Sequence, residues 1–303
     1  MLLRIVIPVY LVVVLAGHTG FYLWLASKVE SAMRVFGLPS EAVAPIFAGL
    51  FTDEYGAVAA MGGIPFTPAQ ITVIAMIVLC FHSIPVESVI TRKIGLSPWK
   101  FGVFRFVLAV GTGIIAAYLA SVFIGGSAPA FLLPDVAATE GASGAYGIST
   151  LSLSFDWGVI LPEMGLGALR TAITISSVVL PLMIVIEIML VYRIVHLLAK
   201  KLSPLCRLLG IGQDALLPLL VGLLLGVSYG AGAIVELNRM KPLPHNDLKL
   251  LGVFLFSCHG IIETSYLFAL TGGNILFVCV LRLAIAITVT ALASRFFKLI
   301  SSR

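Results

Sequence analysis

The stretch GQDALLPLLVGLLLGVSYGAGAIVELN, residues 212–238, is strongly apolar, yet Pro218 and the run GVSYGAGA interrupt it. Proline removes a backbone donor and glycine permits many backbone conformations, so a continuous helix is disfavoured here. Non-helical backbone is tolerated at membrane depth only inside protein or against a water-filled cavity. The stretch therefore predicts a re-entrant helical hairpin over residues 213–237. The alternative is one glycine-rich helix that packs closely against its neighbours.

The composition of the whole chain indicates a membrane protein. Of its 303 residues, 60% are hydrophobic and 11% are charged, and the mean hydropathy is +1.11. Soluble domains average about 25% charged residues. Apolar runs lie at 3–27, 41–61, 69–91, 101–124, 170–198, 213–237, 247–270 and 274–299. They lack the alternation typical of barrel strands, so the sequence predicts an all-α integral membrane protein.

A second interrupted apolar run indicates an internal duplication. Residues 37–45, GLPSEAVAP, align with residues 210–218, GIGQDALLP. The match continues in order and at a nearly constant offset through the pairs Gly49–Gly222, Tyr55–Tyr229, Gly56–Gly230, Ala57–Ala231, His82–His259, Ser88–Ser265, Gly95–Gly272 and Arg105–Arg282. The sequence thus predicts a duplicated unit, preceded in each copy by one extra helix, with the first hairpin at residues 41–61.

The positive charges indicate how the two copies are oriented, because Lys and Arg collect on the cytoplasmic side of a membrane. Arg105, Arg170 and Arg282 lie within or beside apolar runs and are set aside. If both interrupted runs cross the membrane, the other charges divide almost evenly. If both are re-entrant, all but Lys28 and Arg34 fall on one side. This predicts six transmembrane helices plus two re-entrant hairpins in inverted-topology repeats.

The predicted organisation has three parts. Residues 1–125 form the first repeat, residues 126–166 an extracytoplasmic connecting loop, and residues 167–303 the second repeat. Two helix starts are also predicted, with Thr67 capping a helix from Pro68 and Asn246 capping one from Asp247. The expected location is a bacterial inner membrane, which the chain crosses several times with both termini in the cytoplasm.

Ionisable residues inside the apolar runs are the first candidate functional residues, because such residues face a cavity or one another. His82 and His259 lie near the middle of matched segments, and His259 and Glu263 are spaced to share one helix face. A histidine changes charge near neutral pH, which suits proton coupling or hydrogen bonding to a substrate. The alternative is a pair of neutral buried histidines bonded to backbone or serine groups.

Further charged candidates accompany these histidines. Glu87 follows His82, and Arg105 and Arg282 are predicted to pair with Glu87 and Glu263 within their own copies. The alternative reading of these pairs is a structural ion pair that fixes two helices. Glu187 is a lone carboxylate well inside its span, so it is a candidate coupling site or a partner for a histidine.

The proposed gate turns supply the last candidates: Tyr55, Gly56, Tyr229 and Gly230. At these turns, backbone N–H and C=O groups outside the helical hydrogen-bond pattern and the tyrosine hydroxyl would contact a polar solute. The alternative for each tyrosine is packing with its hydroxyl hydrogen-bonded to protein.

Several activities lack sequence support. Neighbouring residues on a helix point about 100° apart, so Cys258 and His259 do not share an ion easily, and no metal site is predicted. The P-loop and the G-x-S-x-G nucleophile pattern are absent. We therefore expect no enzyme activity and no cofactor. No basic patch with interleaved aromatic residues is present, so nucleic acid is not an expected partner.

The stretch 212–238, followed by CHGIIET at 258–264, resembles the Gate or "nucleoside recognition" domain family of small bacterial membrane proteins. Related segments occur in concentrative nucleoside transporters, ferrous-iron transport protein B and spore maturation proteins. The resemblance is best over 205–295 and weaker over 37–125, and it implies a transporter-like fold with paired gate segments. The ferrous-iron relatives carry a cysteine in the gate turn, where this chain has Ser228-Tyr229 and Glu54-Tyr55.

The patterns and the resemblance together predict a secondary transporter that moves a small polar solute, such as a nucleoside, by alternating access between inverted repeats. H⁺ or Na⁺ is the expected coupling ion. The other expected partners are the lipid bilayer and a second copy in a homodimer. Two alternatives stay open: a divalent-metal (ferrous iron) permease, and a non-transporting membrane partner in a larger assembly.

Overall fold

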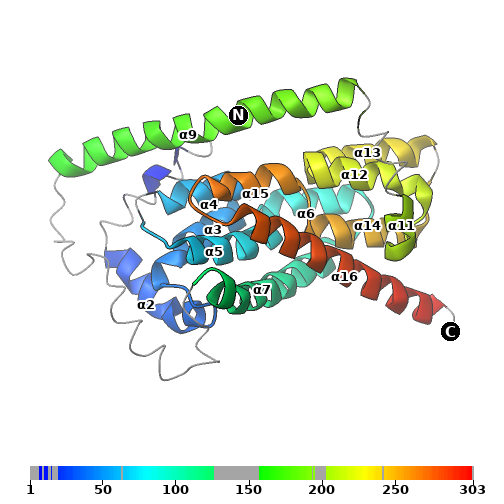
Figure 1. Ribbon diagram of the computed structural model, residues 1–303, viewed down its shortest axis with the longest axis horizontal. Coiled ribbons are helices and arrows are strands. Elements are labelled where there is room, and N and C mark those ends of the chain that lie inside the picture. Colours follow the sequence, from blue (N-terminus) through cyan, green and yellow to red (C-terminus); the bar gives the residue numbers. More distant parts are fainter. Residues whose placement is uncertain are drawn as a thin grey trace. The chain divides into compact units, whose positions relative to one another are not determined.

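The computed structural model describes residues 7–8, 10–12, 15, 20–62, 64–125, 157–192, 194, 203–240 and 242–301. All regular elements in these ranges are helices (Figure 1), which agrees with the predicted all-α class. In the first part of the chain they are α2 (Gly20–Arg34), η1 (Ser40–Ala42, a 3₁₀ turn), α3 (Val43–Phe51), α4 (Glu54–Met61), α5 (Pro68–Cys80), α6 (Ile84–Lys93) and α7 (Pro98–Phe123). In the second part they are α9 (Trp157–Val191), α11 (Ser203–Leu209), η3 (Gln213–Ala215), α12 (Leu216–Leu225), α13 (Val227–Met240), α14 (His245–Ser257), α15 (Ile261–Ala269) and α16 (Ile275–Ser301).

Four helical stretches are long and apolar enough to cross a membrane. They are Pro68–Lys93, Pro98–Phe123, His245–Ala269 and Ile275–Phe297. Each matches an apolar run in the sequence, because about 20 apolar residues are what a helix needs to cross the hydrocarbon core. The pair Ser203–Leu209 and Gln213–Leu225, bent by 115°, is a further candidate, either as a broken span or as a re-entrant loop. The other two predicted spans, 3–27 and 170–198, lie partly outside the described residues.

The chain divides into two compact units, each made of separate segments. The first unit comprises Met1–Ser83, Ala109–Val178 and Leu267–Ile275. The second comprises Ile84–Leu108, Val179–Tyr266 and Leu276–Arg303. Each unit therefore takes segments from both of the halves that the sequence predicts.

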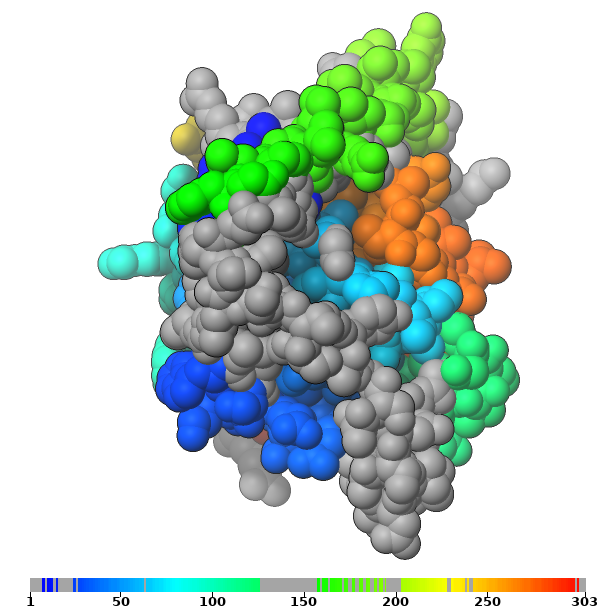
Figure 2. Space-filling model, turned by 90° about the vertical axis from the view of Figure 1, so that its left-hand side faces the viewer, coloured from blue at the N-terminus to red at the C-terminus, as the bar shows by residue number. Residues whose placement is uncertain are grey.

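Helix α9 begins earlier than expected. Its first residue, Trp157, lies within the range 126–166 that we predicted as a connecting loop, of which residues 126–156 are outside the described part. Apolar side chains are exposed along the helix, whose green atoms lie on the surface in Figure 2: Leu161, Leu166, Ile173, Leu180 and Ile184. Exposed apolar side chains over such a length are typical of a surface that faces lipid.

In the first unit, α3 and α4 pack against each other across the two-residue connection Thr52-Asp53 (Figure 1). The side chain of Asp53 caps α4, since its Oδ1 accepts a hydrogen bond from the backbone N–H of Gly56 at 2.8 Å. Thr52 closes the preceding helix, with its Oγ1 donating to the carbonyl of Ala48 at 2.6 Å. A connection this short makes the two helices antiparallel neighbours.

In the second unit, α12 and α13 pack against each other across Gly226. Gly226 has a φ of +97°, a conformation that L-residues with a side chain rarely adopt. The two helices approach closely at Gly222 and Gly230, because a Cβ atom added to Gly230 would lie only 2.7 Å from the Cα atom of Gly222. Glycine at both places therefore lets the two backbones touch.

One predicted helix start is confirmed and the other is wrong. Thr67 caps α5: its Oγ1 accepts from the N–H of Gln70 at 3.3 Å, while Gln70 Oε1 accepts from the N–H of Thr67 at 2.9 Å. Pro68 follows as the first helical residue, where its missing N–H is harmless. Asn246 does not cap α14, because that helix already begins at His245, directly after Pro244.

The reciprocal cap at Thr67 leads to a first prediction. Thr67→Ala removes the acceptor for the Gln70 N–H, so it is expected to lower the free energy of unfolding by about 1 kcal/mol. Ser121→Ala is the matched control, since Ser121 Oγ donates only to the carbonyl of Tyr118 and its loss should change stability by less than about 0.5 kcal/mol. Denaturant unfolding in detergent micelles measures both. Equal effects of the two substitutions would contradict the cap.

Candidate functional site

In the first unit, the span predicted over residues 69–91 is broken at His82 and is not one continuous helix. Helix α5 stops at Cys80, and Ser83 has a φ of +51°. The backbone N–H of Ser83 donates across to the carbonyl oxygen of Gly49 in α3, at 2.9 Å. The imidazole of His82 lies back over α5, with Nδ1 at 3.0 Å from the carbonyl oxygen of Val78.

The same local arrangement occurs in the second unit. Helix α14 stops at Ser257, and Gly260 has a φ of +53°. The N–H of Gly260 donates to the carbonyl oxygen of Gly222 in α12 at 3.1 Å. Nδ1 of His259 lies 2.8 Å from the carbonyl oxygen of Leu255. Each of these residues is the one that the sequence alignment pairs with its counterpart in the first unit.

These helix breaks correct the expectation that His259 and Glu263 share one helix face. His259 lies between α14 and α15, so it does not share a helix face with Glu263, which belongs to α15. Pro85, the second residue of α6, gives a reason for the first break, since a continuous helix would place its ring against the carbonyl of Phe81. At the second break, Gly260 adopts the positive φ without steric penalty.

His82 pairs with a glutamate from the first predicted hairpin. Its Nε2 lies 3.3 Å from Oε2 of Glu54, the first residue of α4. Both side chains are largely buried, so this contact lies away from bulk water. The start of α4 thus presents a carboxylate to the histidine at the end of α5.

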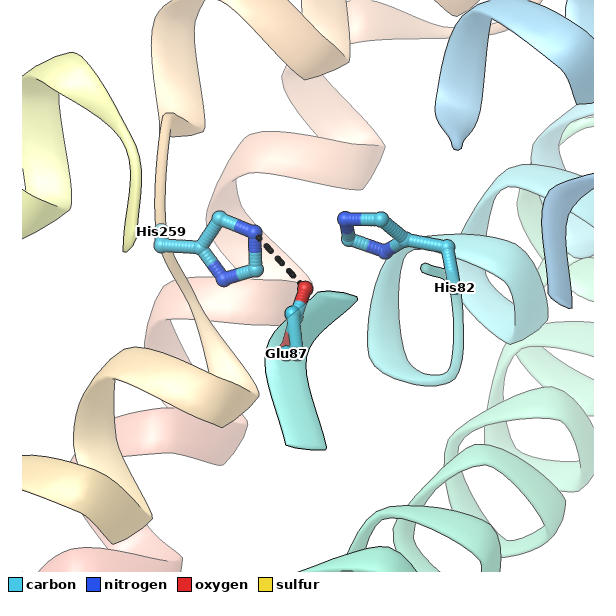
Figure 3. A group of neighbouring side chains, drawn as sticks. All are labelled: His82, Glu87 and His259. Carbon is cyan, nitrogen blue, oxygen red and sulfur yellow. Dashed lines mark ion pairs between the residues drawn. The ribbon is translucent and has the colours of Figure 1, made fainter. Parts of the chain in front are cut away.

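His259 pairs with Glu87 (Figure 3). Its Nε2 lies 3.6 Å from Glu87 Oε1, while the other carboxylate oxygen, Oε2, lies 2.5 Å from Nη1 of Arg105. The guanidinium carbon of Arg105 also lies 5.6 Å from the ring centroid of Phe256. Glu87 therefore lies between an arginine and a histidine, and the predicted pairing of Arg105 with Glu87 is confirmed.

Arg282 has other partners than the predicted Glu263. Its Nη1 donates to Oγ1 of Thr264 at 2.8 Å, and its Nη2 donates to the carbonyl oxygen of His259 at 3.2 Å. The second of these bonds supports the backbone at the helix break. Nε of Arg282 and Oγ of Ser265 are buried and have no hydrogen-bond partner among the described residues.

Both histidines share a constraint on their protons. A backbone carbonyl only accepts hydrogen bonds, so Nδ1 of His82 and of His259 is the protonated nitrogen. In a neutral ring, Nε2 would then carry a lone pair toward a carboxylate oxygen, and two acceptors repel. One proton shared between Nε2 and the carboxylate removes this repulsion. His82 and Glu54, at 3.3 Å, are therefore arranged to hold a proton, whereas the 3.6 Å between His259 and Glu87 is longer than a hydrogen bond.

The turn candidates lie elsewhere than expected. The connections are Thr52-Asp53 and Gly226, whereas Tyr55 and Gly56 lie in the first turn of α4. Tyr55 is buried, and the N–H of Gly56 is bound to the Asp53 cap. The predicted turns at these tyrosines are therefore wrong, because an acidic cap and a glycine with positive φ reverse the chain a few residues earlier.

The remaining predicted site residues are Gly230, Tyr229, Glu187 and Glu263. Gly230 lies in α13 against the backbone of Gly222, which gives it a packing role. Tyr229 lies in α13 and Glu187 lies in α9, but the side chains of both are outside the described residues. Glu263 lies in α15, partly buried.

Two residues of the site are not among the candidates that the sequence predicts. They are Glu54, which pairs with His82, and Thr264, which accepts from Arg282. Thr264 occupies the position that the constant offset pairs with Glu87, so the alignment itself carried this signal. The helical spacing from His259 instead indicated Glu263, one residue away.

Comparison with known proteins supports the membrane assignment. The chain is similar to the uncharacterized membrane protein YvoD of Bacillus subtilis (strain 168), with 25% identity over 287 residues that cover 95% of this chain and 87% of YvoD. No family model and no solved structure matches. The relative and the apolar helices together support a membrane protein, helical throughout its described residues, and membership of the Gate family stays a prediction.

Proposed function

We propose that this chain is a secondary transporter that moves a small polar solute across a bacterial inner membrane by alternating access. The observation that carries the proposal is the helix break beside a buried histidine, which occurs once in each unit with the same hydrogen bonds. Unwound backbone within apolar spans is tolerated where it borders protein or a water-filled cavity. Discontinuous helices in inverted repeats are the usual binding sites of secondary transporters.

In this proposal, α3–α4 and α12–α13 are the two re-entrant gate hairpins. Each is tied to the break of its own unit by one backbone hydrogen bond, from Ser83 to Gly49 or from Gly260 to Gly222. Movement of a hairpin is thereby linked to the backbone beside the histidine. The resemblance of residues 212–238 to gate segments agrees with this assignment.

The two His–Glu pairs are the proposed coupling sites. In this proposal each pair holds one proton between imidazole and carboxylate, and both pairs lie largely buried. Release of that proton leaves two acceptors facing each other, which favours a changed arrangement of the site. Proton coupling is therefore favoured over sodium coupling, since the histidine nitrogens are poor ligands for sodium.

The solute is proposed to contact the buried groups of the second unit that still have hydrogen-bonding capacity. Arg282 Nε is a donor, and Ser265 Oγ is both a donor and an acceptor. Buried polar groups are nearly always hydrogen-bonded, so donors and acceptors of this kind favour a polar ligand. A solute with an oxygen acceptor near its centre, such as a nucleoside or a small carboxylate, fits this chemistry.

A binding screen followed by transport tests the proposal. Purified protein is heated with nucleosides, nucleobases, small carboxylates or divalent metals, because a ligand at 100 times its Kd stabilises the folded state by about 2.7 kcal/mol. The hit is then followed into proteoliposomes under an imposed proton gradient. Gradient-driven accumulation is the expected result. Stabilisation by metals alone would favour a metal permease, and no hit with good unfolding curves would favour a non-transporting partner.

His259→Gln gives a sharper prediction for the coupling site. Glutamine preserves much of the side-chain volume but holds no titratable proton, and a hydrogen bond to a charged group contributes about 1.5–3 kcal/mol. Proton-driven uptake is therefore expected to fall about 10- to 100-fold. Ser257→Ala is the control, since Ser257 Oγ donates only to the carbonyl of Val253 in its own helix. Equal uptake by wild type and His259→Gln, with equal melting temperatures, would remove His259 from the coupling site.

A further inference from the structure

The second unit contains a cavity of about 520 Å³, whose lining includes none of Glu87, Arg105, His259 and Arg282. It is bordered by the segment between α6 and α7, the first turns of α7 and α14, and the last turns of α16. Its volume lies in the range of small-molecule binding sites. None of the groups that line it takes part in the histidine pairs.

The lining of this cavity has two chemically distinct parts. Lys100, His245 and Lys249 supply basic groups, whereas Phe101, Phe104 and Phe297 supply an aromatic wall. The Lys249 ammonium lies 5.4 Å from the ring centroid of Phe297, so its carbon chain follows the apolar wall to a charged end.

The electrostatic balance of the cavity favours an anion. No carboxylate is among the residues that line it. Asp247, the acid between His245 and Lys249 in sequence, accepts instead from the N–H of Gly212 at 3.1 Å. The two lysines are therefore left without an acidic neighbour in the cavity wall.

The cavity lies where candidate membrane spans begin. Pro98 and His245 are the first residues of two of these spans. Trp99, next to Lys100, is 80% exposed, and exposed tryptophan is typical of the membrane–water interface. The residues Arg92, Lys93 and Arg295 are exposed near the same helix ends. This density of positive charge is typical of the cytoplasmic interface, where anionic headgroups lie.

We propose that this cavity binds an anionic phospholipid. Lys100 and Lys249 hold the headgroup phosphate, and the upper part of an acyl chain packs against Phe101, Phe104 and Ala293. Basic pockets between transmembrane helices at the cytoplasmic side suit such headgroups, and an apolar wall beside the charges accommodates the chain. This site is independent of the proposed transport function.

Native mass spectrometry of the full chain with phosphatidylglycerol and phosphatidylcholine tests the proposal. Wild-type protein is expected to prefer phosphatidylglycerol. Lys100→Gln/Lys249→Gln should weaken binding of phosphatidylglycerol about 30-fold, since each lysine near an anionic headgroup contributes about a fivefold factor. Arg92→Gln/Arg207→Gln is the matched control, because both arginines are exposed and lie outside the cavity. An equal loss in the control would mean general surface attraction and would overturn the site.

Two further arms separate a lipid from other anions. Ala293→Phe fills the apolar part of the cavity without a change of charge. It is expected to abolish the preference for phosphatidylglycerol. The melting temperature of this variant in phosphatidylcholine should stay within a few degrees of wild type. Inorganic phosphate is expected to compete only weakly. Binding of inorganic phosphate as tight as that of the lipid, or retained lipid preference in Ala293→Phe, would overturn the lipid assignment.

Discussion

Arg105→Met is expected to lower the free energy of unfolding by about 3–5 kcal/mol, because it leaves the Glu87 carboxylate buried without its arginine. Arg105 is 2% exposed and Glu87 is 3% exposed, so water does not replace the lost partner. Methionine keeps much of the apolar volume, including the contact with Phe256. Unfolding of the purified protein by denaturant in detergent micelles measures the loss.

A double variant identifies the cause of this effect. In Arg105→Met/Glu87→Gln both charges are absent, so stability should recover by at least about 1–2 kcal/mol relative to Arg105→Met alone. Arg239→Met is the exposed control, since Arg239 pairs with Glu236 at 3.8 Å while their side chains are 76% and 66% exposed. Its loss should change stability by less than about 1 kcal/mol. No recovery in the double variant would mean that Arg105 contributes by packing alone.

Gly230→Ala is expected to destabilise the protein by about 1–3 kcal/mol, as overpacking does elsewhere in protein cores. The new Cβ atom would lie 2.7 Å from the Cα atom and 3.1 Å from the N atom of Gly222. Both are backbone atoms, so no side-chain rotation relieves the clash and α12 and α13 must move apart. The same unfolding measurement applies.

The control for this substitution lies in the same helix. A Cβ atom added to Gly232 meets no atom within 4 Å, so Gly232→Ala should be neutral or stabilise the protein by up to about 1 kcal/mol. The contrast between the two substitutions tests the close approach of α12 and α13. Equal stability of Gly230→Ala and Gly232→Ala would mean that the helices do not touch at Gly230.

The spans and one helix start could be predicted from the sequence because they depend on local chemistry. Four apolar runs became candidate spans, since the bilayer thickness sets how many apolar residues a span needs. The cap at Thr67 followed from a threonine placed directly before a proline. Such signals need no knowledge of distant contacts.

Pro85 and Gly260 are local signals of the helix breaks, but the backbone geometry at the breaks also depends on contacts between distant residues and could not be predicted. Ser83 adopts a positive φ that its side chain disfavours, and its N–H binds the carbonyl of Gly49 more than thirty positions away. Helical spacing therefore placed Glu263 beside His259, whereas the backbone leaves the helix at that point. Similarly, the pairing of His82 with Glu54 arises only after α3, α4 and α5 have packed.

The expected cap at Asn246 failed for a different reason. Several residues near it are each able to start a helix, and Pro244 precedes the helix that begins at His245. Proline fixes its own φ and restricts the residue before it, and Pro244 itself occupies the N-cap position, so Asn246 lies inside the helix.

The hydrogen bond from Gly260 to Gly222 has a consequence for how the protein changes conformation. A single neutral hydrogen bond contributes only about 0.5–1.5 kcal/mol net, so an arrangement in which it is broken would still be populated at about 10–40% of the intact one, if nothing else opposed it. The Glu87–Arg105 pair is far harder to separate. We infer that the second unit combines an easily broken hydrogen bond, from Gly260 to Gly222, with an ion pair, Glu87–Arg105, that is hard to break. A ligand with a modest preference for the released arrangement is then sufficient to shift the balance, while the charged cluster stays assembled.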